Sequence, residues 1–161
     1  MTNKKKAELF GLIIAVFAII FDQASKFSIL AFLPKGSSIK ITEFLNLCLV
    51  FNFGTSFGLL NPETHIESCI LVGVSILLII FLIYVFFRMT NNTEKILCAG
   101  IIGGAIGNLI DRFLHGAVVD FIDVHYMDLH WPAFNVADSF ISVCAVLLIV
   151  LSLFSNDKKC P

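Results

Sequence analysis

Charged side chains are scarce in this sequence. Only 14% of its 161 residues are Asp, Glu, Lys or Arg, and the net charge is −1, whereas soluble domains carry about 25% charged residues. Without an excess of positive charge the chain has no electrostatic basis for binding nucleic acid. Hydrophobic residues make up 58% of it, with 17 Phe beside a single Trp. These proportions predict an integral membrane protein rather than a soluble domain.

The sequence also lacks the patterns of a cysteine-based or metal-based site. No C-x-x-C pair and no H-E-x-x-H motif occurs, and the number of cysteines is odd: Cys48, Cys69, Cys98, Cys144 and Cys160. This spacing fits neither a disulfide framework nor a zinc site. The cysteines are best interpreted as small apolar residues of helix surfaces. The histidines, including His125 and His130 on either side of Asp128, are interpreted as exposed interfacial residues.

Four stretches are long and apolar enough to cross a bilayer, which takes about 20 residues. Residues 68–87 and 139–156 carry no charge, and the first stretch is broken only by Asp22 and Lys26. We predict an all-α integral membrane protein with a single membrane domain. Its four transmembrane helices are expected near residues 9–33, 67–87, 95–114 and 134–154.

A fifth apolar stretch, residues 44–62, is interpreted as extended chain because it contains Asn, Gly, Ser and Pro and favours a strand followed by a turn. Four spans place seven of the 11 Lys and Arg residues on one side, which the positive-inside rule makes cytoplasmic, together with both termini. These residues are Lys4, Lys5, Lys6, Arg88, Lys95, Lys158 and Lys159. Residues 34–67 and about 115–133 then lie on the outer side, as a small extended platform and a short lid-like connection.

Charged residues inside spans cost about 2.5–3.5 kcal/mol each at the bilayer centre, so they usually mark function. The predicted topology brings the polar residues of this chain to one level near the outer ends of the helices. These are Asp22, Lys26, Asn108, Asp111, Arg112, Asn135 and Asp138, joined by Asp120 and Asp123 from the second outer connection. We therefore expect a site, or at least a polar plug, in the outer leaflet.

Two charged groups in this layer have alternative interpretations. Asp22 and Lys26 are spaced i, i+4 with the acid first, the favourable orientation for a helical ion pair. The simplest interpretation is a pair that neutralises itself near the interface. Arg112 either extends to lipid headgroups, holds a carboxylate or a backbone carbonyl, or contacts a substrate.

The third predicted helix is rich in glycine. Gly100, Gly103, Gly104 and Gly107 form two overlapping G-x-x-x-G spacings, which let helices approach closely in lipid. We expect them to pack this helix against its neighbours within a monomer; a homodimer seam is the alternative.

Asp120 and Asp138 are the candidates for chemistry. Asp120 lies among the apolar, β-branched residues 118–122, and Asp138 follows Pro132, a residue suited to a helix start. Two carboxylates brought together cannot both ionise cheaply, so they share a proton and can act as acid and base on a water. The structural alternative is that Asp138 only stabilises the N-terminus of a helix by its negative charge, and that Asp120 only faces water.

Another motif and two other functions compete with a carboxylate pair. Residues 54–58 match the G-x-S-x-G motif, but that motif needs a large α/β sheet that this chain cannot build. A small transporter or proton channel would carry polar residues through the whole membrane depth, whereas the inner halves of these helices are almost purely apolar. A structural subunit that pairs through its aspartates would tolerate Asp→Asn changes.

Several blocks of the sequence, taken in order, resemble the lipoprotein signal peptidase (signal peptidase II) family. They are Asp22-Gln23-Ala24-Ser25-Lys26, Asn52-Phe53-Gly54, Gly103 to Arg112, Val118-Val119-Asp120-Phe121-Ile122 and Phe134 to Ser139. The resemblance runs over nearly the whole chain. Thr55-Ser56 and Ala117 depart from the residues common in the family, without removing a carboxylate or an amide.

The resemblance implies an intramembrane aspartyl endopeptidase of the bacterial inner membrane. Such an enzyme removes signal peptides from diacylglyceryl-modified prolipoproteins, just before the lipidated cysteine, and is blocked by globomycin-type peptides. The resemblance further implies that Asp120 and Asp138 are the catalytic pair, that about residues 36–61 form a β-platform, and that no metal or cofactor is needed. Residues that match the positions supporting the site are Asp22, Lys26, Asn52, Gly54, Asn108, Arg112 and Asn135.

Overall fold

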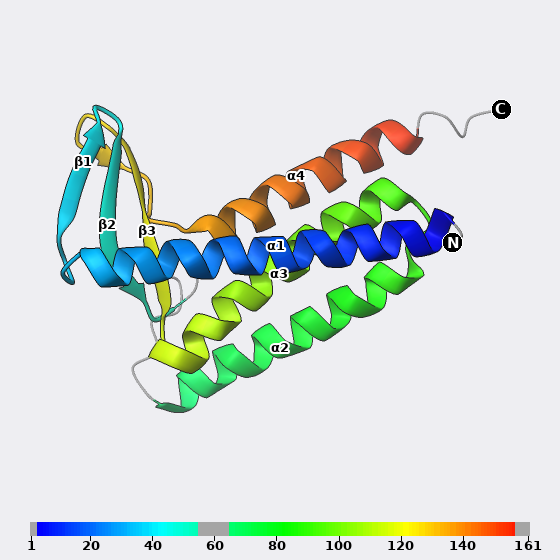
Figure 1. Ribbon diagram of the computed structural model, residues 1–161, viewed down its shortest axis with the longest axis horizontal. Coiled ribbons are helices and arrows are strands. Elements are labelled where there is room, and N and C mark those ends of the chain that lie inside the picture. The colour runs from blue at the N-terminus through cyan, green and yellow to red at the C-terminus, as the bar shows by residue number, and fades with distance from the viewer. Residues whose placement is uncertain (1–2, 55–64, 157–161) are drawn as a thin grey trace.

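Long helices form most of the molecule, as the ribbon shows (Figure 1). The computed structural model describes residues 3–54 and 65–156, and all four helices in this part are long and apolar enough to cross a membrane. The prediction of four spanning helices is therefore confirmed. Their bounds are α1 Asn3–Phe32, α2 His65–Arg88, α3 Asn92–His115 and α4 Val136–Asn156.

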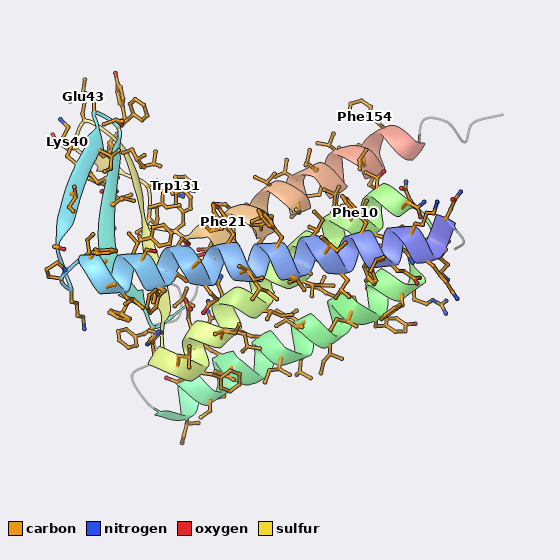
Figure 2. The ribbon with its side chains drawn as sticks, in the orientation of Figure 1. Phe10, Phe21, Lys40, Glu43, Trp131 and Phe154 are labelled. Carbon is orange, nitrogen blue, oxygen red and sulfur yellow. The ribbon has the colours of Figure 1, made fainter. Side chains whose placement is uncertain are left out.

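The helix limits differ from the predicted ones mainly in α1, which begins at Asn3 rather than near residue 9. The three lysines at residues 4–6 are helical because nothing in this stretch breaks the helix, although they are too polar to count as part of a span. Figure 2 shows the side chains along the helices, where large apolar residues such as Phe10, Phe21 and Phe154 are half or more exposed. Exposed apolar side chains of this size are what lipid-facing surfaces require.

α3 lies in the middle of the bundle and packs against α1, α4 and α2. Its glycines make this possible. A Cβ at Gly103 would lie 2.6 Å from the Ala15 carbonyl oxygen of α1, and one at Gly104 would lie 2.6 Å from the Ala137 carbonyl oxygen of α4. The glycines therefore pack helices within one chain, as predicted.

A small antiparallel sheet covers the end of the bundle opposite the start of α1 (Figure 1). Its strands, in the order β1-β2-β3-β4, are β1 Ser38–Thr42, β2 Leu45–Asn52, β3 Val118–Tyr126 and β4 Leu129–His130. The stretch considered as a fifth span thus contains strand β2, and residues 55–61 of the expected platform lie outside the described residues. The second connection is more than a cover over the helix ends, because it supplies β3, which pairs with β2.

Strand β3 is held by a hydrophobic cluster between the sheet and the end of α1. Val119 and Phe121 are buried there against Ile29, Leu33 and Leu49. Successive side chains of a strand point to opposite faces. Asp120, between these two anchors, is thus directed away from the cluster.

Candidate active site

Asp120 is held by two amide side chains from different elements. Its Oδ2 accepts a hydrogen bond from Asn52 Nδ2 at the end of β2 (3.0 Å), and its Oδ1 accepts one from Asn135 Nδ2 (2.7 Å). Only 2% of the Asp120 surface is exposed. The carboxylate is therefore fixed in position but almost fully withdrawn from water.

Asp138 lies in the first turn of α4, where it forms a reciprocal cap with Asn135. The Asn135 side chain accepts a hydrogen bond from the Asp138 backbone N–H (2.9 Å), and Asp138 Oδ2 accepts one from the Asn135 backbone N–H (3.3 Å). This is the arrangement of a capping box. Asp138 therefore does stabilise a helix N-terminus, as the structural alternative expected, but only through Oδ2. Its Oδ1 accepts a hydrogen bond from Asn108 Nδ2 (2.8 Å).

The two asparagines connect the carboxylates to each other and to Lys26. Asn108 Oδ1 accepts hydrogen bonds from Lys26 Nζ (3.0 Å) and from Asn135 Nδ2 (3.1 Å). Because an ammonium group only donates, Lys26 forces the oxygen of Asn108 toward itself and leaves its amide nitrogen for Asp138. The amide orientations, and hence the hydrogen bonds to both aspartates, follow from one buried charge.

Lys26 also joins two buried carboxylates. Its Nζ lies 2.8 Å from Asp22 Oδ2 and 2.7 Å from Asp111 Oδ2, and all three side chains are at most 2% exposed. The interpretation of Asp22 and Lys26 as a pair that neutralises itself near the interface was therefore incomplete. The ion pair exists, but it is buried and shares its cation with a second acid from α3.

Each of these acids fixes the backbone beside one candidate catalytic residue. Asp22 Oδ1 accepts a hydrogen bond from the N–H of Ala137 (2.9 Å), next to Asp138. Asp111 Oδ2 accepts one from the N–H of Val119 (3.0 Å), next to Asp120. The buried ion cluster therefore holds the start of α4 and strand β3 in a fixed relation.

Arg112 and Gly54 lie at the edge of this network. The guanidinium donates long hydrogen bonds to the carbonyl oxygens of Gly54 (3.4 Å) and Asn108 (3.5 Å). Of the three roles left open for Arg112, the structure supports the one in which it holds backbone carbonyls. Gly54 is the last described residue before residues 55–64, so the G-x-S-x-G pattern that starts there lies largely outside the described part of the chain.

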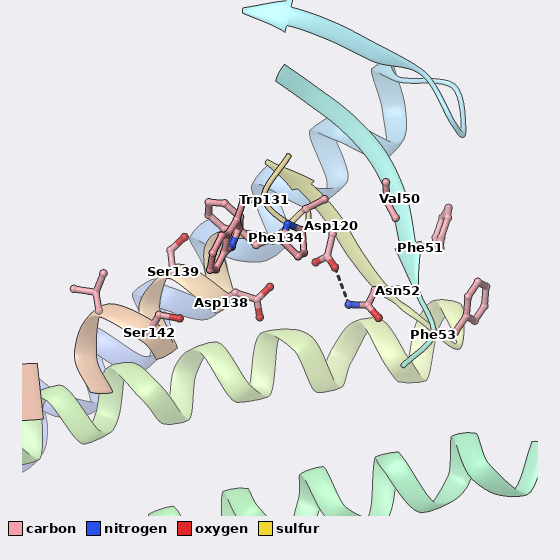
Figure 3. Close-up of a pocket in the computed structure, with 13 residues that line it drawn as sticks. Val50, Phe51, Asn52, Phe53, Asp120, Trp131, Phe134, Asp138, Ser139 and Ser142 are labelled. Atoms are coloured by element: carbon pink, nitrogen blue, oxygen red, sulfur yellow. Dashed lines mark hydrogen bonds between the residues drawn. The ribbon is translucent and has the colours of Figure 1, made fainter. Parts of the chain in front are cut away.

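Both aspartates line one cleft of about 830 Å³ between the sheet and α4 (Figure 3). Apolar residues form most of its wall, among them Phe51, Phe53, Trp131 and Phe134. Apart from the carboxylates, the polar lining consists of Asn52, Ser139 and Ser142. In residues 3–54 and 65–156, no group of three or more His, Cys, Asp or Glu side chains is placed to bind a metal ion. The cleft can therefore hold an apolar ligand beside two acids.

The environments of two aspartates on β3 shift their pKa values in opposite directions. Burial, followed by the negative charge of Asp138, raises the pKa of Asp120 to about 7 against the opposing effect of its two asparagine donors. Burial also acts on Asp123, but hydrogen bonds from Asn46 and His130 outweigh it and lower the pKa of that carboxyl. Asp120 is thus partly protonated near neutral pH, whereas Asp123 is an ordinary ionised acid.

Comparison with known proteins shows which family the chain belongs to. A family profile described as signal peptidase (SPase) II matches residues 14–154, nearly the whole chain. The chain belongs to the signal peptidase II family. It is therefore a protease.

Curated relatives of this family match over most of their length. A protein named lipoprotein signal peptidase from Thermodesulfovibrio yellowstonii is 40% identical over 153 residues, covering 94% of this chain and 98% of the relative. One of the same name from Polynucleobacter necessarius is 40% identical over 141 residues, covering 86% and 85%. A solved bacterial membrane enzyme superposes with a TM-score of 0.84 at 32% identity, covering 93% of this chain and 91% of that one.

The structure brings together every site residue predicted from the resemblance to signal peptidase II, although this placement does not test their roles. Sequence reasoning missed two members of the network. Asp111 was expected in the polar layer but not among the residues that support the site. Gln23, which donates to Asp111 Oδ1 (2.9 Å) and to the Gly107 carbonyl (3.1 Å), was expected in neither. Their sequence positions could have indicated this, because Gln23 lies three residues before Lys26 on α1 and Asp111 lies three residues after Asn108 on α3.

Proposed function

We propose that this protein is an aspartic endopeptidase that removes the signal peptide from diacylglyceryl-modified prolipoproteins, just before the lipidated cysteine. The observation that carries the proposal is the pair Asp120 and Asp138, lining one cleft with separate amide donors on each. The names of its curated relatives support lipoprotein precursors as the substrate class.

The proposed chemistry uses the pair as a unit that shares one proton. The ionised carboxylate takes a proton from a water molecule while the oxygen of that water attacks the scissile carbonyl carbon. The protonated carboxyl of the pair donates its proton to the carbonyl oxygen. The C–N bond of the tetrahedral intermediate then breaks. The nitrogen of the departing cysteine takes up the proton that came from the water, and one hydroxyl of the intermediate returns its proton to the other carboxylate as the C=O bond forms again. The raised pKa of Asp120 supports a protonated partner at neutral pH.

The supporting residues have positioning roles in this proposal. Asn52 and Asn135 hold Asp120, and Asn108 holds Asp138. The cluster of Lys26 with its two acids keeps β3 and α4 at a fixed separation. Arg112 holds the Gly54 carbonyl at the cleft's edge.

The location of the cleft agrees with a lipid-modified substrate. An acyl chain partitions into a bilayer by about 0.8 kcal/mol per buried CH₂, so the scissile bond of such a precursor waits near the membrane surface. The cleft lies between the first turns of α4 and the sheet, at one end of the helix bundle. We propose an orientation in the bacterial inner membrane with both termini cytoplasmic and the cleft near the outer leaflet, in a monomer that globomycin-type peptides block.

The test is cleavage by the purified protein of one precursor prepared with and without its diacylglyceryl group. Mass spectrometry of the products should show cleavage directly before the lipidated cysteine and no cleavage of the unmodified precursor. Equal cleavage of both forms, or cleavage at another bond, would contradict the proposed specificity. No cleavage of either form would contradict the proposed function.

A further inference from the structure

A second groove lies on the lipid-facing side of the bundle, remote from the two aspartates. It has a volume of about 470 Å³ and is lined by α1, α2 and α3. Along α1 it runs from Glu8 to Ile19 and along α3 from Ala99 to Ile106. Its lining is apolar apart from Glu8 at one end. The proposed peptidase chemistry does not use this groove.

The floor of the groove is closed by close packing. A Cβ at Gly11 would lie 3.0 Å from the Phe86 ring and 3.3 Å from Ala99 Cβ. Ala99 and Ile102 of α3 are buried beneath it, whereas Leu12 and Phe87 on its walls are 61% and 59% exposed. The groove is thus a shallow furrow with a solid base, open on the side that faces lipid.

The length of the groove corresponds to one leaflet. Ile19 lies eleven positions after Glu8 on α1, which at a rise of about 1.5 Å per residue is about 17 Å. The hydrocarbon core of a bilayer is about 30 Å thick, so this is about half of it. A furrow of this length and composition fits a single extended acyl chain.

Basic residues flank, in the sequence, the residues that line one end of the groove. Lys4, Lys5 and Lys6 precede Glu8 on α1, and Arg88 directly follows Phe87 on α2. Glu8 itself is neutralised by the buried Lys95, whose Nζ lies 2.9 Å from Glu8 Oε1 and 5.3 Å from the centre of the Phe86 ring.

These four basic residues thus form a cluster close in sequence to Glu8 and Phe87, which line this end of the groove, and Glu94 in the first turn of α3 opposes them. Such a cluster beside a spanning helix favours an anionic lipid headgroup.

We propose that this groove is a binding site for an anionic phospholipid, with one acyl chain in the groove and the phosphate at residues 4–6 and Arg88. The site is separate from the one that takes the lipid-modified substrate. In the proposed orientation it belongs to the cytoplasmic leaflet.

The test is native mass spectrometry of the purified full-length chain with added phosphatidylglycerol. Leu12→Trp places an indole in the groove, and Ile13→Trp is its matched control, because Ile13 is next along α1 and 53% exposed but does not line the groove. The parent and Ile13→Trp should each retain one lipid, and Leu12→Trp should lose it. Equal retention by the two variants, or no retained lipid on the parent, would overturn the proposal.

A second lining position guards against a folding defect. Val16 lines the groove and is 45% exposed, so Val16→Trp should also lose the retained lipid. Phosphatidylglycerol should raise the thermal unfolding temperature of the parent and of Ile13→Trp, but not that of the groove variants. If it stabilises all of them equally, the lipid does not bind in the groove. If the parent instead forms a dimer that the groove variants lose, the groove is a seam between copies and the proposal is wrong.

Charge is tested separately. Arg88→Gln should weaken retention of phosphatidylglycerol, whereas Lys40→Gln, at the sheet end of the molecule (Figure 2), should not. Phosphatidylcholine should compete poorly with phosphatidylglycerol for the parent. Equal retention of the two lipids would overturn the headgroup assignment.

Discussion

Replacing Asn52 by alanine should move the alkaline side of the pH–activity profile to higher pH. Asn52 Nδ2 donates a hydrogen bond of 3.0 Å to Asp120 Oδ2 and thereby favours the ionised carboxylate. Without this donor the pKa of Asp120 rises further above its ordinary value. A raised pKa keeps the proton on the carboxyl to higher pH, so the protonated partner that the proposed mechanism needs survives longer as pH increases.

The size of the shift follows from the strength of the lost bond. A hydrogen bond to a charged group contributes about 1.5–3 kcal/mol, and one pKa unit corresponds to about 1.36 kcal/mol. Asn52 is only half-buried and lines the cleft, so water replaces part of what the amide supplied. We therefore expect a shift of about one pH unit, the low end of that range.

The assay is kcat/KM for cleavage of a lipidated precursor between pH 5 and about 10, because this quantity reports the free enzyme. In the parent it should fall above the Asp120 pKa of about 7. Asn46→Ala is the matched control, since Asn46 is an amide on the same strand that donates to Asp123 instead (2.9 Å). An alkaline limb that stays in place in Asn52→Ala, or moves equally in both variants, would refute the assignment of that limb to Asp120.

Three further predictions concern the ion cluster, the helix packing and the response of the activity to metal removal. Lys26→Met leaves Asp22 and Asp111 buried without their shared cation, which should cost about 3–5 kcal/mol and lower the unfolding temperature in detergent; Lys40→Met, which breaks an exposed pair, should not. Gly103→Ala, whose Cβ would lie 2.6 Å from the Ala15 carbonyl oxygen, should destabilise the protein, whereas Gly73→Ala, with nothing within 4 Å of its Cβ, should not. Treatment with a chelator should leave the cleavage rate unchanged, and a loss restored by a divalent cation would contradict the aspartic mechanism.

Most of the fold could be predicted because lipid imposes simple rules on sequence. Residues 68–87 contain no charge and form most of α2, and the glycines of α3 mark the faces that α1 and α4 approach. The pairing of β2 with β3 was not predicted. These strands are 65 or more residues apart in the sequence, and their register depends on contacts with α1 that local patterns do not encode.

The site could be predicted in its members but not in its connections. Topology alone placed Asp120, Asp138 and Asn135 at one level, and the resemblance to signal peptidase II added Asn52 and Gly54. What the sequence could not indicate is that Lys26 neutralises two acids at once. An i, i+4 spacing suggests a closed pair, and only the packing of α3 against α1 brings Asp111 to the same ammonium group.

The most direct test of the central claim compares three aspartate variants of the purified protein in one cleavage assay. Asp120→Asn and Asp138→Asn remove proton chemistry while keeping side-chain shape, and Asp123→Asn is the control on β3, bonded to Asn46 and His130 rather than to a residue of the cleft. The account predicts that the first two lower the cleavage rate by at least about a hundredfold and remain inserted in the membrane, while Asp123→Asn cleaves like the parent. Parent-level cleavage by either Asp120→Asn or Asp138→Asn would contradict it.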